Sequence, residues 1–300
     1  MIPDNTINPS ILKENTQIKA LLDLLDDPDE NVFSTVSDKI ISIGKDIIPN
    51  LENLWESIHN EETQERIEQL IHRLHFRDLT NEFSEWANSS NDLLSGSIIV
   101  SKYHYPEMQS AIVMQEIEKL RRNIWLELNS YLTPLEKINV LNSIFFNYYK
   151  QTGVEVGYDN PDHFLINKTL EGKKGNAISN GIIYQSLCKL LDIPVRAINI
   201  PQQFILGYFD EQYDALNPSG HPSEKISFFI DPFSGHIYSH KDIESYLKKL
   251  SAPPSTSYFR AMNNKRIIKL LLKELSKCFD NENNQYKMNE LISLANLLEP

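Results

Sequence analysis

Cysteine is scarce in this sequence, and its scarcity argues against two kinds of covalently or metal-stabilised architecture. The 300 residues contain only Cys188 and Cys278, which are far apart and lie in apolar helical patterns. This arrangement offers neither a disulfide framework nor the closely spaced cysteines of a zinc site. We therefore expect two buried, reduced, structural cysteines, and a protein with no metal and no other cofactor.

The sequence also lacks long apolar runs and an excess of positive charge. No segment approaches the roughly 18 consecutive apolar residues of a membrane span. The first residues, MIPDNTINPSILKENTQ, have neither the basic start nor the apolar core of a secretion signal. The formal net charge of −12 repels phosphate backbones. We therefore expect a soluble, cytoplasmic protein with no membrane and no nucleic acid among its partners.

The first 88 residues have the pattern of paired helices. Apolar residues recur at helical spacing on both sides of the turn signal DDPDE, as Ile18, Leu21, Leu22 and Leu25 before it and as Val32, Val36, Ile40 and Ile43 after it. Gly44 then ends the second helix, and a short link containing a proline follows. This order resembles a HEAT repeat. We assign residues 1–88 to HEAT-like helical repeats that pack on the neighbouring part of the chain.

The pattern changes from helices to short strands in the middle of the chain. The letters TPLE, from Thr133 onward, have the spacing of a capping box at a helix start, and a further helix is expected from about residue 178 to 191. The segments VRAINI, QFILGYF and KISFFIDP are rich in β-branched and aromatic residues, which is typical of antiparallel strands. Residues 251–300 are predicted as C-terminal helices. The predicted fold class is therefore α+β, predominantly helical.

A series of short segments carries a resemblance to a known superfamily. In order along the chain they are DLLSGSIIVSKYHYP, LNSIFFNYYKQTGVEV, EGKKGNAIS, LLDIPVRA, NIPQQFILGYF and FFIDPFSGH. They are similar to successive landmarks of the transglutaminase-like superfamily, and more narrowly of the SirB-one N-terminal-domain family. The resemblance implies a papain-like, transglutaminase-like core with a small antiparallel sheet, which we assign to residues 89–250.

The resemblance also implies a site with a nucleophile at a helix start, a base on a strand and a carboxylate after a further strand. In this chain those three positions fall on Ala177, Gln203 and Asp231. Alanine offers no nucleophilic atom, and glutamine does not exchange a proton near neutral pH. Loss of a nucleophile alone can cost on the order of a million-fold in turnover. We therefore expect a non-catalytic protein that acts as a binding or regulatory scaffold for a protein or peptide partner.

The alternative is a hydrolase or peptidase that uses residues outside these three positions. Ser179 lies two residues beyond Ala177 on the same helix, rotated by about 200°, and a hydroxyl at a helix start is more often a capping or first-turn hydrogen-bonding group. Cys188 lies roughly 16 Å further along the helix axis, which fits a core position. We expect neither residue to replace the missing nucleophile.

Five further residues are candidates for lining a vestigial cleft, namely His163, Gly175, Asn176, Ser179 and Phe204. For His163 the competing interpretation is a turn histidine that satisfies backbone groups. Two interpretations of Asp231 also stay open: its carboxylate accepts backbone N–H bonds within the turn DPFSG, or it holds the side chain of Gln203.

His236 and His240 are four residues apart, a spacing that places two zinc ligands on one face of a helix. The letters GHIYSHKD indicate a strand and a turn rather than a helix, so that geometry does not apply. We expect no metal site at these histidines.

Overall fold

The computed structural model describes residues 18–27, 29–89, 91–210, 222–253, 255 and 257–298. The chain divides into two compact units, Met1–Glu82 and Phe83–Pro300. The boundary between them lies within the long helix α4 (Glu61–Asn88). The division into three parts at residues 88 and 250 stays a prediction, and the stretch considered as a secretion signal lies outside the described residues.

The first unit consists of helices throughout its described part. Residues 18–23 are helical, and α2 (Glu30–Ile43) and α3 (Ile48–Ser57) follow before α4. Asp29 caps α2, because its carboxylate accepts a hydrogen bond from an N–H of the first turn at 2.8 Å. Gly44 ends α2 at a φ of 103°, a conformation that favours glycine.

Apolar residues from all of these helices form one core. Its buried members are Leu21, Leu25, Val36, Ile40, Ile47, Ile48, Leu51, Ile67, Leu70 and Leu74. Ile43, which the spacing placed on the apolar face, is instead 39% exposed because it is the last residue of α2. The assignment of these helices to HEAT repeats stays a prediction.

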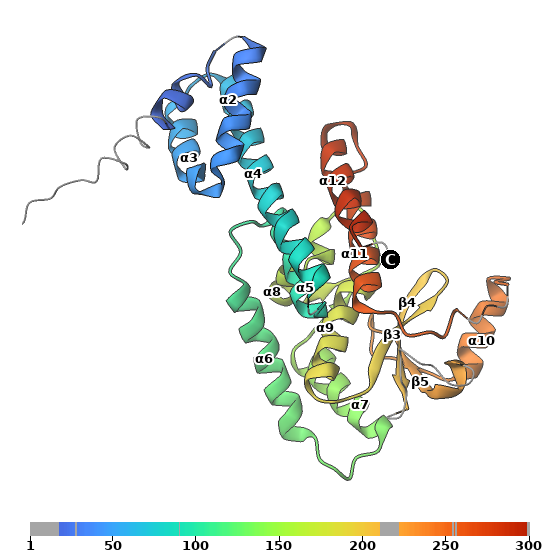
Figure 1. Ribbon diagram of the computed structural model, residues 1–300. Helices are drawn as coiled ribbons and strands as arrows, with labels where there is room; N and C mark the ends of the chain where they lie inside the picture. The colour runs from blue at the N-terminus through green and yellow to red at the C-terminus, as the bar shows by residue number, and fades with distance from the viewer. Residues whose placement is uncertain are drawn as a thin grey trace, which may run out of the picture. The chain divides into compact units, whose positions relative to one another are not determined.

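The second unit combines helices with a small sheet (Figure 1). Its first part consists of α5 (Leu93–His104), α6 (Ser110–Glu127), α7 (Pro134–Asn142), the π-helical η2 (Ser143–Tyr148), η3 (Pro161–Phe164), α8 (Ile166–Gly172) and α9 (Ala177–Leu190). The strands are β1 (Thr152–Gly153), β2 (Lys174–Gly175), β3 (Val195–Ile200), β4 (Gln203–Phe209), β5 (Ile226–Ile230) and β6 (Ile237–Tyr238). The remaining helical elements are η4 (Pro222–Lys225), α10 (His240–Lys249), α11 (Asn264–Ser276), η5 (Lys277–Phe279), η6 (Glu282–Asn284) and α12 (Gln285–Asn296).

Four of the strands form an antiparallel sheet in the order β3-β4-β5-β6, while β1 and β2 form a short parallel pair. A two-residue turn joins β3 to β4, with Ile200 paired to Gln203 across it. Pro201 followed by Gln202 at a φ of 60° fits a type II turn. The predicted strands and the capping box at Thr133 are confirmed, and so is the α+β class.

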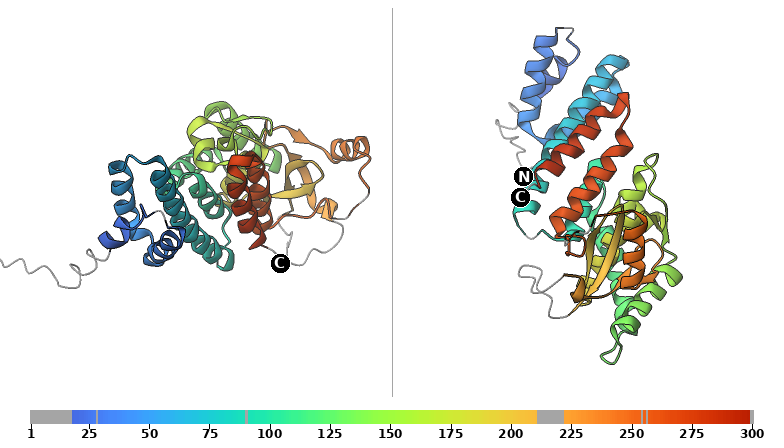
Figure 2. Two further views of the ribbon diagram at one scale, coloured as in Figure 1. Left: turned by 90° about the horizontal axis from the view of Figure 1, so that it is seen from above. Right: turned by 90° about the vertical axis from the view of Figure 1, so that its right-hand side faces the viewer.

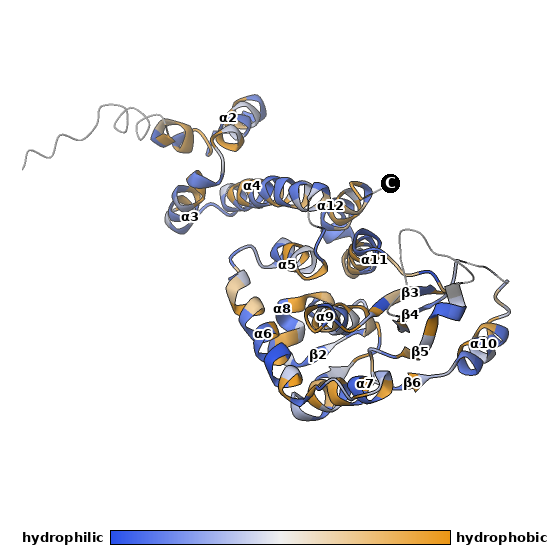
Figure 3. Ribbon diagram, turned by 60° about the horizontal axis from the view of Figure 1, so that its bottom comes forward, coloured by the Kyte–Doolittle hydropathy of each residue, from blue (hydrophilic) through white to orange (hydrophobic). Residues whose placement is uncertain are grey.

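Helices cover both faces of this sheet (Figure 3). On one face α9 packs against β3 and β4, and Gly181 permits the close approach, because a Cβ there would lie 2.3 Å from the ring of Phe204. Ile205 follows Phe204 along β4 and therefore faces the other side, where it joins Phe229 and Ile243 of α10 in a buried cluster. The sheet is thus held between α9 and α10.

The C-terminal helices α11 and α12 lie side by side (Figure 2). Helix α11 also packs against α5 and α9, so the helical tail belongs to the same unit as the sheet. Within the described part of the chain, no helix combines the length and the apolar character that crossing a membrane requires.

Candidate functional site

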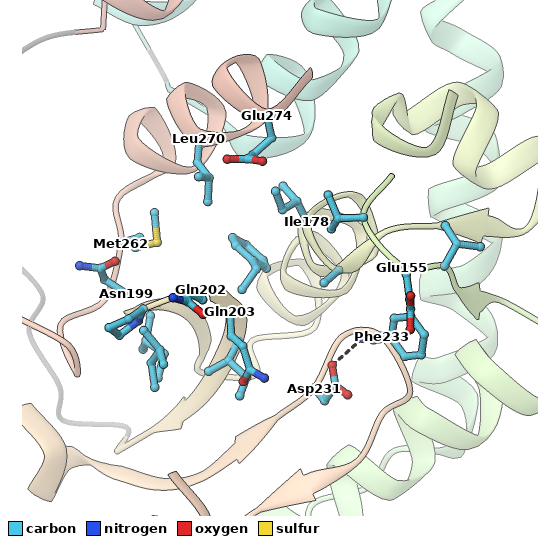
Figure 4. A pocket seen from close by; sticks show the side chains of 18 of the residues that line it. Glu155, Ile178, Asn199, Gln202, Gln203, Asp231, Phe233, Met262, Leu270 and Glu274 are labelled. Carbon is cyan, nitrogen blue, oxygen red and sulfur yellow. Dashed lines mark hydrogen bonds between the residues drawn. The ribbon is translucent and has the colours of Figure 1, made fainter. Parts of the chain in front are cut away.

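A cleft of about 910 Å³ opens where α9 begins (Figure 4). Its walls also include the β3–β4 hairpin, the turn after β5, Tyr238 of β6, the loop around Glu155, and α11 with η5 and the preceding Met262. Its size falls in the range of small-molecule and peptide sites, which are roughly 300–1,000 Å³.

The three positions carried over from the superfamily all line this cleft. Ala177 is the first residue of α9, Gln203 is the first residue of β4, and Asp231 directly follows β5. Residues that are far apart in the sequence therefore meet at one site, in the order helix start, strand and turn that the resemblance implies.

The carboxylate of Asp231 makes the contacts of a turn residue and does not hold the side chain at the base position. The two carboxylate oxygens of Asp231 accept hydrogen bonds from the N–H of Phe233 at 2.9 Å and from the hydroxyl of Ser234 at 3.0 Å. Gln203 is exposed, and no hydrogen bond joins its side chain to Asp231 or to another side chain of the described residues. Of the two interpretations of Asp231, these contacts fit support of the turn.

Of the five further candidates, only Phe204 is among the described residues that line the cleft. The other four lie in the layer of residues that packs around the start of α9. Asn176 is fully buried and caps α9, since its side-chain oxygen accepts from the N–H groups of Ile178 and Ser179, at 3.0 Å each. The hydroxyl of Ser179, 2% exposed, donates to the carbonyl of His163 at 2.7 Å.

Gly175 is tightly enclosed at the approach to α9. A Cβ on this residue would lie 2.5 Å from the side chains of Asn180 and Thr169. Both Gly175 and Asn180 are buried. A residue without a side chain is therefore needed here for α8 and the start of α9 to pack this closely.

Two side-chain amides connect the segments that form the cleft. The sequence pattern did not single out either of them. Asn142 accepts from the hydroxyl of Tyr184 on α9 and donates to the carbonyl of Gly235 in the turn after Asp231, at 2.8 Å in both cases. The side chain of Asn180 accepts from the amide of Gln151 at 3.0 Å and donates to the backbone carbonyl of Thr152 at 3.3 Å. The helix start and the Asp231 turn are thereby fixed relative to each other.

The C-terminal helices contribute a polar group that sequence reasoning also missed. Glu274 of α11 accepts from the hydroxyl of Tyr158 at 2.7 Å and from the ammonium of Lys277 at 2.8 Å. This hydrogen bond to Glu274 raises the pKa of Lys277, and burial raises the pKa of Tyr158. Lys277 therefore stays a protonated ammonium near neutral pH, which is not a nucleophile.

Neither cysteine lines the cleft. Cys188 is fully buried, and burial raises the pKa of its thiol, while burial raises the pKa of Cys278 to about 11. His240 begins α10, where the pattern had indicated a turn, and its Nε2 lies 2.7 Å from the carbonyl of Ile226. Among the described residues, no three His, Cys, Asp or Glu side chains are grouped so that they could hold a metal ion.

Three carboxamides give the cleft a distinctive polar surface. Asn199, Gln202 and Gln203 all line it, and all three are exposed. Figure 4 shows them on the β3–β4 hairpin, opposite Leu270 and Glu274. Each amide offers both a donor and an acceptor to an occupant of the cleft.

Comparison with known proteins matches residues 111–273 to the model of a family described as the transglutaminase-like superfamily. The UPF0162 protein BU173 of Buchnera aphidicola is 25% identical over 218 residues, which cover 73% of this chain and 77% of the relative. Protein SirB1 of Salmonella typhimurium is 24% identical over 186 residues, covering 61% and 65%. The UPF0162 protein YchA of Escherichia coli is 23% identical over 194 residues, covering 64% and 68%. No solved structure matches the chain.

Proposed function

Because this chain belongs to the transglutaminase-like superfamily, we propose that its cleft binds a segment of a protein or peptide without catalysing a reaction on it. The observation that carries this proposal is the chemistry of the inherited positions. An open cleft has a methyl group at the nucleophile position, Ala177, and a carboxamide at the base position, Gln203. Transfer of an acyl group needs a nucleophile and a base at these two places.

The rest of the lining offers no substitute for the thiol and imidazole of the superfamily site. The described residues that line the cleft include no cysteine, serine, threonine or histidine, and Lys277 is held as an ammonium by Glu274. The two nucleophile candidates outside the inherited positions are Ser179 and Cys188. Both are buried, and the Ser179 hydroxyl is already bonded to a backbone carbonyl. No observation therefore favours the enzymatic alternative.

The lining suits an extended peptide. Apolar side chains such as Ile178, Met262 and Leu270 offer contact for apolar side chains of an occupant. The amides of Asn199 and Gln203 match the donor and acceptor pattern of a peptide backbone. Three carboxylates and one lysine line the cleft, so its charge disfavours phosphate-bearing or other anionic ligands.

This proposal predicts that a bulky side chain in the cleft weakens the binding of peptides selected for affinity to the protein. Peptides of twelve random residues, displayed on phage, would be selected on the full chain and their affinities measured by calorimetry. Ala177→Trp places an indole in the cleft and is expected to weaken binding at least tenfold, because the indole occupies space that a bound peptide needs.

Ala111→Trp is the matched control, because Ala111 is exposed and is also an alanine in the first turn of a helix. Its affinities should equal those of the unaltered chain, and mass spectrometry should recover every bound peptide unchanged. Equal binding by Ala177→Trp, or cleavage of the selected peptides, would contradict the proposal.

A further inference from the structure

A second hollow lies on the second unit and shares no lining residue with the cleft. It encloses about 440 Å³ where the C-terminal half of α6 meets α7 and η2. Its apolar lining consists of Leu126, Val140, Ile144 and Tyr148. Leu126 is 67% exposed and Tyr148 is 74% exposed, so neither side chain is packed into the core of the unit. Trp125, beside Leu126 in the chain, is 60% exposed.

A group of cations borders this hollow, which we call the basic rim and define as Lys119, Arg122 and Lys173. Two of them lie close to the ring of Tyr149: its centroid is 5.8 Å from the Lys119 ammonium and 5.1 Å from the Lys173 ammonium. Arg122 is exposed and directly precedes Asn123 on α6, and burial raises the pKa of Tyr149. Two acids are also close: Glu116, whose carboxylate is 3.7 Å from the Lys119 ammonium, and Glu127, which is in the lining of the hollow.

The hollow and the basic rim are continuous. Asn123 lines the hollow, and its amide donates to the hydroxyl of Tyr149 at 3.3 Å. Tyr148, also in the lining, has its ring 5.7 Å from the ring of Tyr149. One surface therefore carries an apolar depression at one end and a net positive charge at the other, on a chain whose formal net charge is −12.

We propose that this surface docks an amphipathic helix of a partner protein, with a large apolar side chain in the hollow and acidic side chains against the basic rim. The dimensions match a helix. Lys119 and Leu126 are seven residues apart on α6, which is about 10 Å along the axis. A partner helix presents an acidic and an apolar residue at the same separation when they are two turns apart.

The chemistry of the surface favours a protein over a nucleic acid. Exposed Trp and Tyr side chains are the types most enriched among energetically dominant interface residues, and the described lining of the hollow contains no cation to pair with a phosphate. Three cations on a strongly acidic chain are also few for a phosphate backbone. The net charge of −12 opposes the approach of a second copy of this chain at low salt.

The test uses two synthetic 18-residue helical peptides with the same leucine stripe. One carries glutamate on its polar face and the other carries glutamine at the same positions. Calorimetry on the full chain is expected to show binding of the glutamate peptide at least tenfold tighter than of the glutamine peptide. Because the basic rim is exposed, the difference should shrink as the salt concentration rises.

Substitutions in the basic rim and in the hollow test whether the peptides bind at this surface. Lys119→Glu with Lys173→Glu should weaken the glutamate peptide at least tenfold, and Leu126→Ser should weaken both peptides. The double variant Lys241→Glu with Lys249→Glu makes the same charge change on exposed positions of α10 and should leave binding unchanged.

Several outcomes would overturn the proposal. Four of them concern the peptides and a competing ligand: no measurable binding of either peptide, equal binding of both peptides, an equal loss in the α10 variant, or equally tight binding of a single-stranded oligonucleotide. Self-association of the unaltered chain that disappears in the Lys119→Glu and Lys173→Glu variant would identify a second copy as the occupant and would overturn it as well. Ala177→Trp should bind the glutamate peptide normally, which separates this surface from the cleft.

Discussion

Replacing Ala177 with cysteine is expected to give a thiol that reacts with iodoacetamide at pH 7 roughly 100-fold faster than either native cysteine. Position 177 is the first residue of α9 and lines an open cleft, so the introduced thiol is accessible and lies at a helix N-terminus. Such positions lower a thiol pKa to about 3.5–7.5. The native thiols are held back, since Cys188 is fully buried and the pKa of Cys278 is about 11.

Adding Gln203→His should increase the reactivity of the introduced thiol further and make its pH profile follow the imidazole. The measurement is the alkylation rate from pH 5 to 9, followed by intact mass. Asn199→Cys is the matched control, because Asn199 lines the same cleft from a strand and lacks the helix N-terminus. If Ala177→Cys reacted no faster than Asn199→Cys and ignored Gln203→His, the two positions would not be the inherited nucleophile and base positions.

Replacing Asn142 with leucine should lower the free energy of unfolding of the second unit by about 3 kcal/mol. The substitution removes the acceptor of the Tyr184 hydroxyl, which is fully buried, and the donor to the Gly235 carbonyl. A buried polar group left without a partner costs about 1–3 kcal/mol. Urea titration followed by tryptophan fluorescence measures the change, with Trp55→Phe as background so that only the second unit reports.

Two variants separate the hydrogen bonds from a general loss of packing. Tyr184→Phe alone should cost about 1 kcal/mol, and Asn142→Leu should cost less in that background than in the unaltered chain, because the orphaned hydroxyl is gone. Asn139→Leu, at an exposed position of the same helix, should change stability by less than about 0.5 kcal/mol. A large effect of Asn139→Leu, or an unchanged cost of Asn142→Leu beside Tyr184→Phe, would contradict the assigned role.

Local patterns in the sequence were sufficient to predict the elements that build the site. The β3 and β4 boundaries coincide with VRAINI and QFILGYF because alternation, β-branched residues and a two-residue turn act over short distances. The helix that begins at Ala177 was predicted within one residue at each end. The order of short motifs then placed Ala177, Gln203 and Asp231 at one cleft, which propensity alone would not do.

Features that depend on distant contacts were not predictable in this way. Glu274 and Lys277 reach the cleft because α11 folds back on the core, and no local signal in the helical tail records that. The roles of Asn142 and Asn180 depend on partners that tertiary packing brings to them. The apolar hollow could not be predicted from the sequence for the same reason. The helical spacing of apolar residues in α6 does not indicate that Leu126 is exposed.

The most direct test of the central claim is to treat the native full-length chain with a thiol-directed probe and a hydroxyl-directed fluorophosphonate, and to measure intact mass and modified residues. The account predicts no stoichiometric labelling by either probe, because the described lining of the cleft contains no thiol or serine hydroxyl. Chain unfolded in urea should react with the thiol probe at both cysteines. Stoichiometric labelling of Ser179 or Cys188 in the native chain would contradict the claim and identify an enzyme.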